Sequence, residues 1–394
     1  MKLACVIHRF GADIAGGSEG HCRGVAERLA EHHDVTILTT CARNHITWQN
    51  EYPAGLSKVG GLPVRRFPVV RTRSMHQFAG ISELVFSGAA SEPEQERWFR
   101  ENGPEAPGLL EFLERHGADY DWILFWSFRY YQTFFGLPIV ADRAVLVPTA
   151  EDDPLIRRAG ILRRFFTLPA GFVFLTPEEE ALVAVRSPRP LTPSCVIGSG
   201  FDPARSGSAQ LPAGLEISRP FVLYLGRIDP NKGCETLLRH FVKHQTTAKR
   251  SVPLVMAGPA NMPIPDHPSI RCLGYVDEAV REALLANASL LIVPSHYESL
   301  SIVLLEAWNH GVPALVNGRC SVLKGQAIRA DGALYYKNFD EFARGLDYLL
   351  DHPDVARQLG QQGLAYVNRE YRWPGVIQKL EVFLGSLSNR GPRP

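Results

Sequence analysis

Short apolar runs alternate with amphipathic stretches along most of the chain. In the first half, strand-like runs cover residues 3–7, 34–39, 64–70, 122–126, 144–147 and 172–175, and residues with helical spacing separate most of them. These runs are apolar at consecutive positions, which is typical of strands that are buried on both faces. We therefore expect the first half to form a parallel sheet that is covered by helices on both sides.

A second alternation of the same kind begins after residue 220. Strands are expected at 221–225, 253–257, 270–273, 290–293 and 312–316, and helices at 234–244, 278–286 and 303–309. Residues 199–220, between the two halves, are rich in Ser, Gly, Pro and Ala, and Gly207, Pro212, Gly214 and Pro220 interrupt any period. We interpret this segment as a linker.

Together the two halves predict an α/β protein with two Rossmann-like, doubly wound domains. We expect an N-terminal domain over residues 1–198 and a C-terminal domain over residues 221–372, both facing a cleft at the carboxyl ends of their strands. A last helix, at 373–388, is expected to pack back on the first domain. The length of 394 residues agrees with two domains, because it exceeds what one core usually serves.

Composition excludes several classes of protein. The 42 Lys and Arg residues nearly balance the 41 Asp and Glu residues, and the resulting formal net charge of +1 does not indicate a nucleic-acid binder. Charged residues at 21% together with aromatic residues at 10% do not describe a disordered chain. Recognition of an anion must therefore be local, and the presence of only eight lysines makes each of them conspicuous.

The spacing of the cysteines and the length of the apolar runs indicate where in the cell the protein is expected. Seven cysteines are widely spaced without a Cys-x-x-Cys motif, so neither a disulfide framework nor a zinc site is expected. The first apolar run ends at once in His8-Arg9, and no later run approaches the ~20 residues of a membrane helix. We expect a cytoplasmic protein and leave open a peripheral contact with the inner face of the membrane.

A glycine-bounded turn follows the first strand of the second half. Gly226 and Gly233 permit close approach of the backbone, Arg227 supplies a bidentate fork, and Lys232 supplies a point charge. This combination suits a diphosphate. A solvated loop whose cations meet surface carboxylates would show the same sequence.

Two glutamates lie near the start of the apolar helix at 303–309. Glu298 precedes the helix, whereas Glu306 lies more than a turn inside it. Ser299 or Ser301 could cap the helix, and its free amides would attract an anion by ~0.3 to 2 kcal/mol. A buried carboxylate such as that of Glu306 needs hydrogen-bond donors, which either a ribose diol or an internal Arg or Lys would provide.

The ordered set Gly16-Gly17-Ser18-Glu19, Gly226-Arg227-x4-Lys232-Gly233 and Glu298-x7-Glu306 resembles the GT-B glycosyltransferases of family 4. These are retaining enzymes that use nucleoside-diphosphate sugars, and the resemblance spans nearly the whole chain. It implies that Arg227 and Lys232 hold the diphosphate, that Glu306 takes the ribose and that Glu298 approaches the transferred sugar.

The resemblance also implies backbone contacts. In the donor site it places Gly17 and Gly226 near the diphosphate, the amides of Leu300, Ser301 and Ile302 at sugar or phosphate, and Tyr275 and Val276 at the base. The predicted catalytic residues are Glu298, Arg227 and Lys232. On the acceptor side of the N-terminal domain it implies Gly16, Glu19 and Glu151. Considered without the resemblance, Gly16 and Gly17 could instead form a helix-initiating turn with Ser18 as N-cap.

One segment departs from this pattern, and another combines basic and apolar residues. Where many relatives carry a His-Asp pair that contacts the sugar, this chain has Glu151, which puts a histidine role and turnover itself in doubt. His8 and His296 are not equivalent replacements, and we interpret them as structural or rim histidines. Residues 155–166 mix arginines with apolar residues, as a membrane-surface helix would, but the arginines fall on more than one face, which favours an interdomain or surface helix.

No metal and no other cofactor is expected. Asp119-Tyr120-Asp121 has the form of the metal-binding Asp-x-Asp of GT-A glycosyltransferases, but it directly precedes the apolar run 122–126, which favours a polar strand entrance. If Arg227, Lys232 and a helix start already face the leaving diphosphate, a divalent ion is not needed to neutralise it.

The predicted function is retaining, metal-independent transfer of a hexose-type sugar. The donor would be a UDP or GDP sugar, and the acceptor a hydroxyl of a glycan, a lipid-linked molecule or a small molecule. Two alternatives remain open: a nucleotide-sugar epimerase of GT-B fold, and a non-catalytic nucleotide-sugar binder. A dinucleotide oxidoreductase is disfavoured, because no Gly-x-Gly-x-x-Gly follows the first strand.

Overall fold

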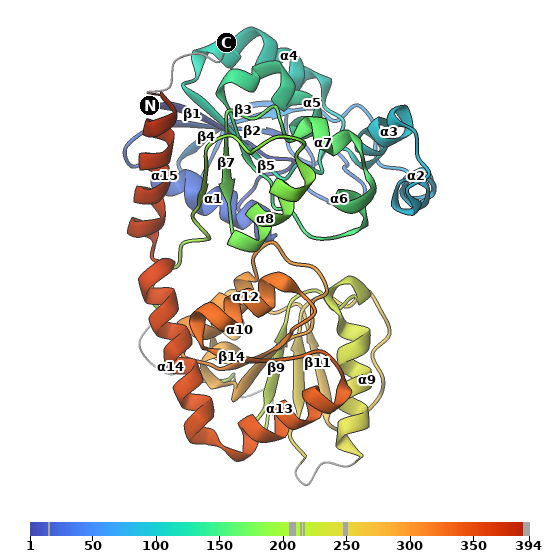
Figure 1. Cartoon of the computed structure of the whole chain (residues 1–394), viewed down its shortest axis with the longest axis vertical. Helices are drawn as coiled ribbons and strands as arrows, with labels where there is room; N and C mark the ends of the chain where they lie inside the picture. Colours follow the sequence, from blue (N-terminus) through green and yellow to red (C-terminus); the bar gives the residue numbers. More distant parts are fainter. Residues whose placement is uncertain (15, 205–209, 213–214, 216, 247–250, 389–394) are drawn as a thin grey trace. The chain divides into compact units, whose positions relative to one another are not determined.

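The computed structural model describes residues 1–14, 16–204, 210–212, 215, 217–246 and 251–388. The chain divides into two compact units, which we call the first unit (Met1–Gly200 and Trp373–Pro394) and the second unit (Phe201–Arg372) (Figure 1). Of the predicted linker 199–220, residues 205–209, 213–214 and 216 lie outside the described residues, and Gly207 and Gly214 are among them.

The described part of the first unit contains an eight-stranded sheet in the order β3-β4-β2-β1-β5-β6-β7-β8. Its strands are β1 (Lys2–Val6), β2 (Asp34–Thr40), β3 (Gly55–Val59), β4 (Leu62–Phe67), β5 (Trp122–Trp126), β6 (Ala144–Val147), β7 (Gly171–Phe174) and β8 (Ser194–Val196). The neighbouring strands run parallel except β3 and β4, which form an antiparallel hairpin. Its two-residue turn, Gly60-Gly61, has positive φ at both positions, as a type I′ turn requires. The sheet is therefore parallel, as expected, apart from this hairpin at its edge.

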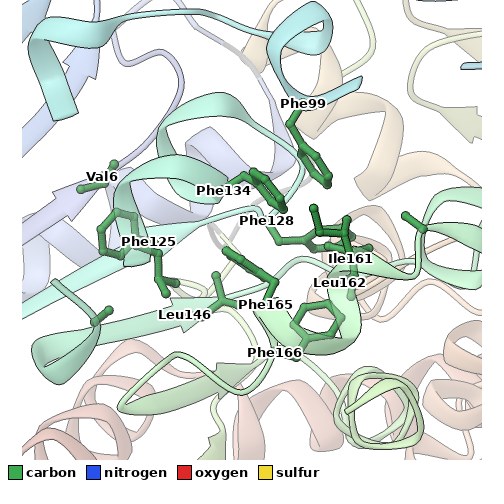
Figure 2. Packing of buried hydrophobic residues seen from close by; sticks show 14 of the residues in the cluster. Val6, Phe99, Phe125, Phe128, Phe134, Leu146, Ile161, Leu162, Phe165 and Phe166 are labelled. Atoms are coloured by element: carbon green, nitrogen blue, oxygen red, sulfur yellow. The ribbon is translucent and has the colours of Figure 1, made fainter. Parts of the chain in front are cut away.

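Helices pack on this sheet around an aromatic core. They are α1 (Gly17–Leu29), α2 (Met75–Ser87), α3 (Glu92–Asn102), α4 (Pro107–His116), α5 (Tyr131–Gly136), α6 (Pro154–Arg158), α7 (Ile161–Phe165), α8 (Pro177–Arg186) and α15 (Trp373–Ser388), with the 3-10 turns η1 (Gly117–Asp119) and η2 (Leu137–Arg143). Phe99, Phe134 and Phe165 stack in series, with ring centroids 3.7 Å and 5.3 Å apart (Figure 2). The core thus joins α3, α5 and α7.

Residues 155–166 do not form one helix. Ala159 and Gly160 separate α6 from α7, and Leu155, Ile161 and Leu162 point into the core of the first unit, where the last two are seen in Figure 2. The arginines between these apolar residues are exposed. The interpretation as a single interdomain or surface helix is therefore wrong, and the apolar side chains that a membrane-surface helix would need are buried. Among the described helices, none is long and apolar enough to cross a membrane.

The C-terminal helix α15 packs on the first unit, beside α1 (Figure 1). The Trp373 ring lies so close to Gly24 and Gly200 that a Cβ at either glycine would approach it to 2.5 Å or less. Phe383 lies in the same way against Gly171 of β7, with 3.0 Å between the ring and such a Cβ. Small residues therefore make room for the aromatic side chains at the α15 interface.

In its described residues, the second unit has a six-stranded parallel sheet in the order β11-β10-β9-β12-β13-β14. The strands are β9 (Val222–Leu225), β10 (Leu254–Ala257), β11 (Ile270–Gly274), β12 (Leu290–Val293), β13 (Ala314–Asn317) and β14 (Ala333–Tyr336). The helices are α9 (Cys234–Gln245), α10 (Glu278–Asn287), α11 (Ile302–Asn309), α12 (Ser321–Ala330), α13 (Phe339–Asp351) and α14 (Pro353–Glu370), with the 3-10 turn η4 (Pro230–Lys232). β14 was not among the predicted strands.

Candidate functional site

The strand order of the second sheet places a topological switch point beside β9. β10 lies on one side of β9 and β12 on the other. The connection that follows β9 therefore leads to one side of the sheet, and the connection that follows β12 leads to the other. Ligands of open α/β sheets bind at such a switch point, at the carboxyl ends of the strands. The segments that leave β9 and β12 there are loop 226–233 and loop 294–301, and they carry most of the predicted donor residues.

Loop 226–233 is an ordered turn. The Asp229 carboxylate accepts a hydrogen bond from the Lys232 backbone N–H at 3.0 Å, and the Tyr224 hydroxyl donates to the Arg227 carbonyl at 2.6 Å. Gly226 and Gly233 both have positive φ, at 131° and 73°. The Arg227 side chain is 49% exposed, and its Nη1 lies 3.7 Å from Asp229 Oδ2. The predicted phosphate-binding cation is thus accessible and only loosely paired.

Lys232 and Glu298 contact each other across the two loops. Lys232 Nζ lies 2.9 Å from Glu298 Oε1, and both side chains are mostly buried. The backbones also approach closely, because a Cβ at Gly233 would lie 2.1 Å from the Pro294 carbonyl oxygen. Only glycine fits there. Two of the predicted catalytic residues are therefore brought together, and Glu298 neutralises much of the charge that Lys232 would offer to a phosphate.

The start of α11 differs from the prediction in its capping. Ser301 occupies the N-cap position, but its hydroxyl makes no capping hydrogen bond. The Ser301 backbone N–H instead donates to Gln326 Oε1 of α12, at 3.2 Å. The predicted use of the Ser301 amide by a ligand therefore competes with an internal bond. Leu300 beside it is buried and Ile302 half-buried.

Glu306 contacts Arg281 of α10 through its Oε1. The sequence left open whether Glu306 meets a ribose or an internal cation, and an internal Arg is present. Burial raises the pKa of the Glu306 carboxyl, and Arg281 opposes part of that rise. A carboxylate has about four lone-pair sites, so Arg281 can orient Glu306 and leave capacity for further donors. The Glu306 side chain is still 17% exposed.

The predicted base segment forms an exposed turn at the end of β11. Gly274, with φ of 66°, accepts a hydrogen bond through its carbonyl oxygen from the Gly258 N–H at 2.7 Å, and Gly258 follows β10. Tyr275 is 76% exposed and Val276 is half-buried. β10 separates this turn from β9, so Tyr275 and Val276 lie at the same edge of the sheet as loop 226–233, one strand further out.

In the first unit, α1 begins at Gly17 with Gly16 as its N-cap. The alternative that Ser18 is the N-cap is therefore wrong. Ser18 Oγ donates to Glu19 Oε2 at 2.9 Å, and Glu19 Oε1 lies 2.6 Å from Arg9 Nε and 3.0 Å from His8 Nε2. Burial would raise the pKa of Glu19, but His8 and Arg9 lower it below its ordinary value. The predicted acceptor-side Glu19 is thus a buried anion with three side-chain partners.

Two other predicted features of the first unit have internal partners. Glu151 Oε2 lies 3.7 Å from Arg129 Nη2, which also contacts Asp153 at 2.7 Å. His8 is 1% exposed and stacks on Tyr130 with ring centroids 3.7 Å apart, so it is a buried histidine rather than an open ligand. 

The Asp-x-Asp sequence does not act as a pair. Asp121 accepts a hydrogen bond from the Lys2 backbone N–H at 2.7 Å, whereas Asp119 lies 3.2 Å from His116 Nδ1. Throughout the described chain, no cluster of three or more His, Cys, Asp or Glu side chains could hold a metal ion.

Three residues of the site were not foreseen. Arg281 contacts Glu306, and the side-chain amides of Asn317 and Gln326 bind the backbone of loop 294–301. None of them lies in a motif, and each reaches the site only because α10, α12 and β13 pack beside it. Asp229 could have been found, because Asp followed by Pro is a common way to begin a helical turn.

Comparison with known proteins bears on the fold and on the family of the second unit. Residues 219–352 match the family described as glycosyl transferases group 1. These residues lie within the second unit, and we call the matched segment the group 1 domain. Along the whole chain, the fold is that of sucrose-phosphate synthase from Thermosynechococcus elongatus, with a TM-score of 0.72 at 17% identity and 98% of each chain covered. The predicted GT-B fold and the resemblance to glycosyltransferases are therefore confirmed.

Two further proteins extend the comparison of the group 1 domain and of the whole chain. A D-inositol 3-phosphate glycosyltransferase of Acidothermus cellulolyticus is 26% identical over 96% of this chain and 88% of its own length. Anabaena HepE, solved in complex with UDP-glucose, has a TM-score of 0.68 at 14% identity and covers 98% of this chain and 100% of its own. The first curated relatives match locally, and the alignment spans only 39 to 45% of their lengths.

Proposed function

We propose that the protein is a retaining glycosyltransferase that takes its sugar from a nucleoside-diphosphate sugar, with UDP and GDP as the candidate nucleotides. The observation that carries the proposal is the Lys232–Glu298 contact of 2.9 Å, which joins two loops at the switch point of a group 1 domain. The complex of HepE with UDP-glucose supports the choice of donor class.

The main chemical task of the site is to stabilise the leaving group. Cleavage of the anomeric C–O bond leaves a growing negative charge on the diphosphate, and fixed cations and amides act best where they need not reorganise. Arg227, which is accessible, would contact the diphosphate first. Lys232 would exchange its bond to Glu298 for one to phosphate, so that both partners become available as the donor enters.

Glu298 would then face the transferred sugar, and Glu306 the ribose. A carboxylate released from Lys232 can accept hydrogen bonds from sugar hydroxyls. Arg281 opposes part of the rise that burial causes in the pKa of Glu306 and orients its carboxyl group, so that its oxygens can accept from the two ribose hydroxyls. The proposed donor site therefore uses two carboxylates for hydroxyl recognition and two cations for the diphosphate.

Retention of configuration is proposed to occur by attack on the face that the leaving group departs from. A phosphate oxygen would take the proton of the acceptor hydroxyl, because the released Glu298 carboxylate is assigned to the hydroxyls of the transferred sugar and Glu306 to the ribose. The acceptor, a glycan, a lipid-linked molecule or a small molecule, would belong to the first unit, near Gly16 and Glu151. Arg227, Lys232 and the start of α11 would replace a divalent ion at the diphosphate.

A panel of UDP, GDP and ADP sugars tests the donor, and product analysis tests the reaction. Transfer to an acceptor hydroxyl with the anomeric configuration of the donor is expected. A product that forms from the donor alone would instead establish the epimerase.

The pairing of Glu151 with Arg129 favours one other function, a non-catalytic nucleotide-sugar binder. Glu151 occupies the position where many of the family 4 glycosyltransferases that the sequence resembles carry a histidine. Its contact with Arg129 holds a carboxylate at that position. Saturable donor binding without transfer to any of a broad set of acceptors would establish this second candidate.

A further inference from the structure

Two buried side-chain amides hold the ends of loop 294–301. Asn317, at the end of β13, donates through Nδ2 to the carbonyl oxygens of Pro294 and Ser295, both at 3.2 Å. Gln326, on α12, accepts the Ser301 N–H through Oε1 at 3.2 Å. Glu298 lies between these two anchors, so the loop is fixed from the side of β13 and α12 as well as by Lys232.

Gln326 is an unusual residue to bury for stability alone. It is 0% exposed, and its Nε2 has no hydrogen-bond partner within the part of the chain that the structure describes. A buried amide that is half unsatisfied costs about as much free energy as its single bond returns. The Ser301 hydroxyl, 1% exposed, likewise has no partner among the described residues. The Gln326 bond to Ser301 is therefore better explained by the backbone that it orients at Ser301 than by a gain in stability.

That bond fixes the first turn of α11. Free N–H groups at a helix start need acceptors, and an anionic ligand is the acceptor that the helix dipole favours. With the Ser301 N–H directed at Gln326, the neighbouring Leu300 and Ile302 amides remain for a ligand, since neither has an acceptor among the described residues. The position of Gln326 on α12 thus determines which amides of the α11 start can meet the diphosphate.

We propose that Gln326 is a positioning residue for the donor diphosphate, which it serves by holding the Ser301 backbone and thereby the start of α11. The inference rests on the proposed function and assigns a role to a residue outside the motifs of the group 1 domain. Gln326 itself does not touch the donor. Its effect should fall mainly on the phosphate groups, because the residues proposed for the base, Tyr275 and Val276, follow β11 and the residue proposed for the ribose, Glu306, lies beyond the first turn of α11.

The test compares Gln326→Met with the wild-type chain in binding the preferred nucleoside diphosphate, chosen from UDP, GDP and ADP, and the corresponding nucleoside. Methionine keeps the size of the side chain and removes the acceptor. Affinity for the diphosphate should fall about tenfold, the loss expected for one hydrogen-bonded anchor, whereas affinity for the nucleoside should change less than twofold. In turnover, the KM for the donor should rise more than kcat falls.

Gln132→Met in the first unit is the matched control. Gln132 is also 0% exposed, and neither atom of its side-chain amide has a partner in the described structure. The control should leave diphosphate binding unchanged. Should Gln326→Met not fold, Gln326→Asn keeps the amide but shortens its reach, and the same loss of diphosphate affinity is expected.

Equal losses for nucleoside and diphosphate would show a merely structural role and overturn the proposal, as would unchanged affinity for both. A wild-type chain that binds none of the three diphosphates would instead remove the proposed function itself, and this inference with it.

Discussion

At the scale of single residues, the donor site is built from groups that pair with one another. Lys232 contacts Glu298, Glu306 contacts Arg281, and Arg227 alone of these cations is half exposed and loosely paired. Pairing keeps the buried charges compensated. It also means that a donor must displace internal bonds, which makes each pair a place where substitution should affect binding and turnover differently.

Lys232→Ala should lower kcat by about 10²- to 10³-fold, because it removes a fixed cation from the leaving diphosphate. Steady-state kinetics with the preferred donor measures the effect. Lys337→Ala serves as the control, since Lys337 is exposed and, among the described residues, Arg319 and Glu341 bind its backbone rather than its side chain. An unchanged kcat in Lys232→Ala would remove Lys232 from the site.

Glu306→Gln should weaken binding of a ribonucleoside diphosphate about tenfold, and binding of its 2′-deoxy analogue much less. The amide keeps the size of the carboxylate but loses the charge-assisted bonds to ribose hydroxyls. Titration calorimetry with both nucleotides gives the comparison. An equal loss for both would mean that Glu306 serves only to compensate Arg281.

The residues that follow strands could be predicted, but their partners could not. Arg227, Lys232 and Glu298 lie directly after apolar runs, and the carboxyl ends of parallel strands meet at one edge of a sheet. Arg281 and Gln326 lie in the middle of ordinary amphipathic helices. Their contacts depend on how α10 and α12 pack, and no local pattern records that packing.

At the scale of secondary structure, hydrophobic runs identified the central strands and the edge strand β11, but missed the edge strands β3, β8 and β14. β5, β6 and β12 have the predicted bounds because every residue in them is buried. β3 alternates in burial and β8 has only three residues, so neither produces an apolar run. The same reasoning explains residues 155–166, where a continuous apolar and basic pattern hid the break at Ala159-Gly160.

Phe383→Ala should destabilise the first unit by about 3 to 5 kcal/mol, the usual cost of emptying a buried aromatic site. Phe383 lies 7% exposed in α15, against β7. Val382→Ala, one residue earlier and 68% exposed, should change stability by less than about 0.5 kcal/mol. Calorimetric unfolding separates the two variants. Equal effects would show that α15 does not stabilise the first unit.

A buried histidine links α1 to β5 and should make the first unit sensitive to acid. The Trp126 indole donates to His21 Nδ1, and His21 Nε2 bonds the Gly198 carbonyl, both at 3.0 Å. Burial lowers the pKa of His21 to about 4, below the 6.5 expected when unfolded. The unfolded state therefore binds the extra proton between pH 6.5 and 4, and the folded state loses up to about 3 kcal/mol as pH falls through that window.

His21→Gln should flatten this pH dependence relative to the wild type, since an amide does not titrate. Comparing the two proteins also cancels the opposite contribution of Glu179, whose pKa burial raises to about 8. Unfolding free energies measured from pH 4 to 7 provide the test. Parallel curves for wild type and variant would contradict the assignment to His21.

At the scale of the whole molecule, the two units repeat one architecture with different contents. Each sheet has its switch point beside its first strand, β1 in the first unit and β9 in the second. The group 1 family match lies within the second unit. It leaves out residues 201–218 and 353–372 at the two ends of that unit. The near-zero net charge agrees with this arrangement, because recognition of an anion then depends on a few local cations rather than on a general field.

Calorimetric unfolding of the full chain with UDP-glucose, GDP-glucose and ADP-glucose tests the central claim, that the second unit binds a nucleoside-diphosphate sugar. At 100 times its dissociation constant, one of these donors should stabilise the second unit by about 2.7 kcal/mol. The Lys232→Ala chain should show a smaller shift at the same concentration. If all three donors leave the unfolding of the wild-type chain unchanged, the site at β9 and β12 does not bind a nucleotide sugar.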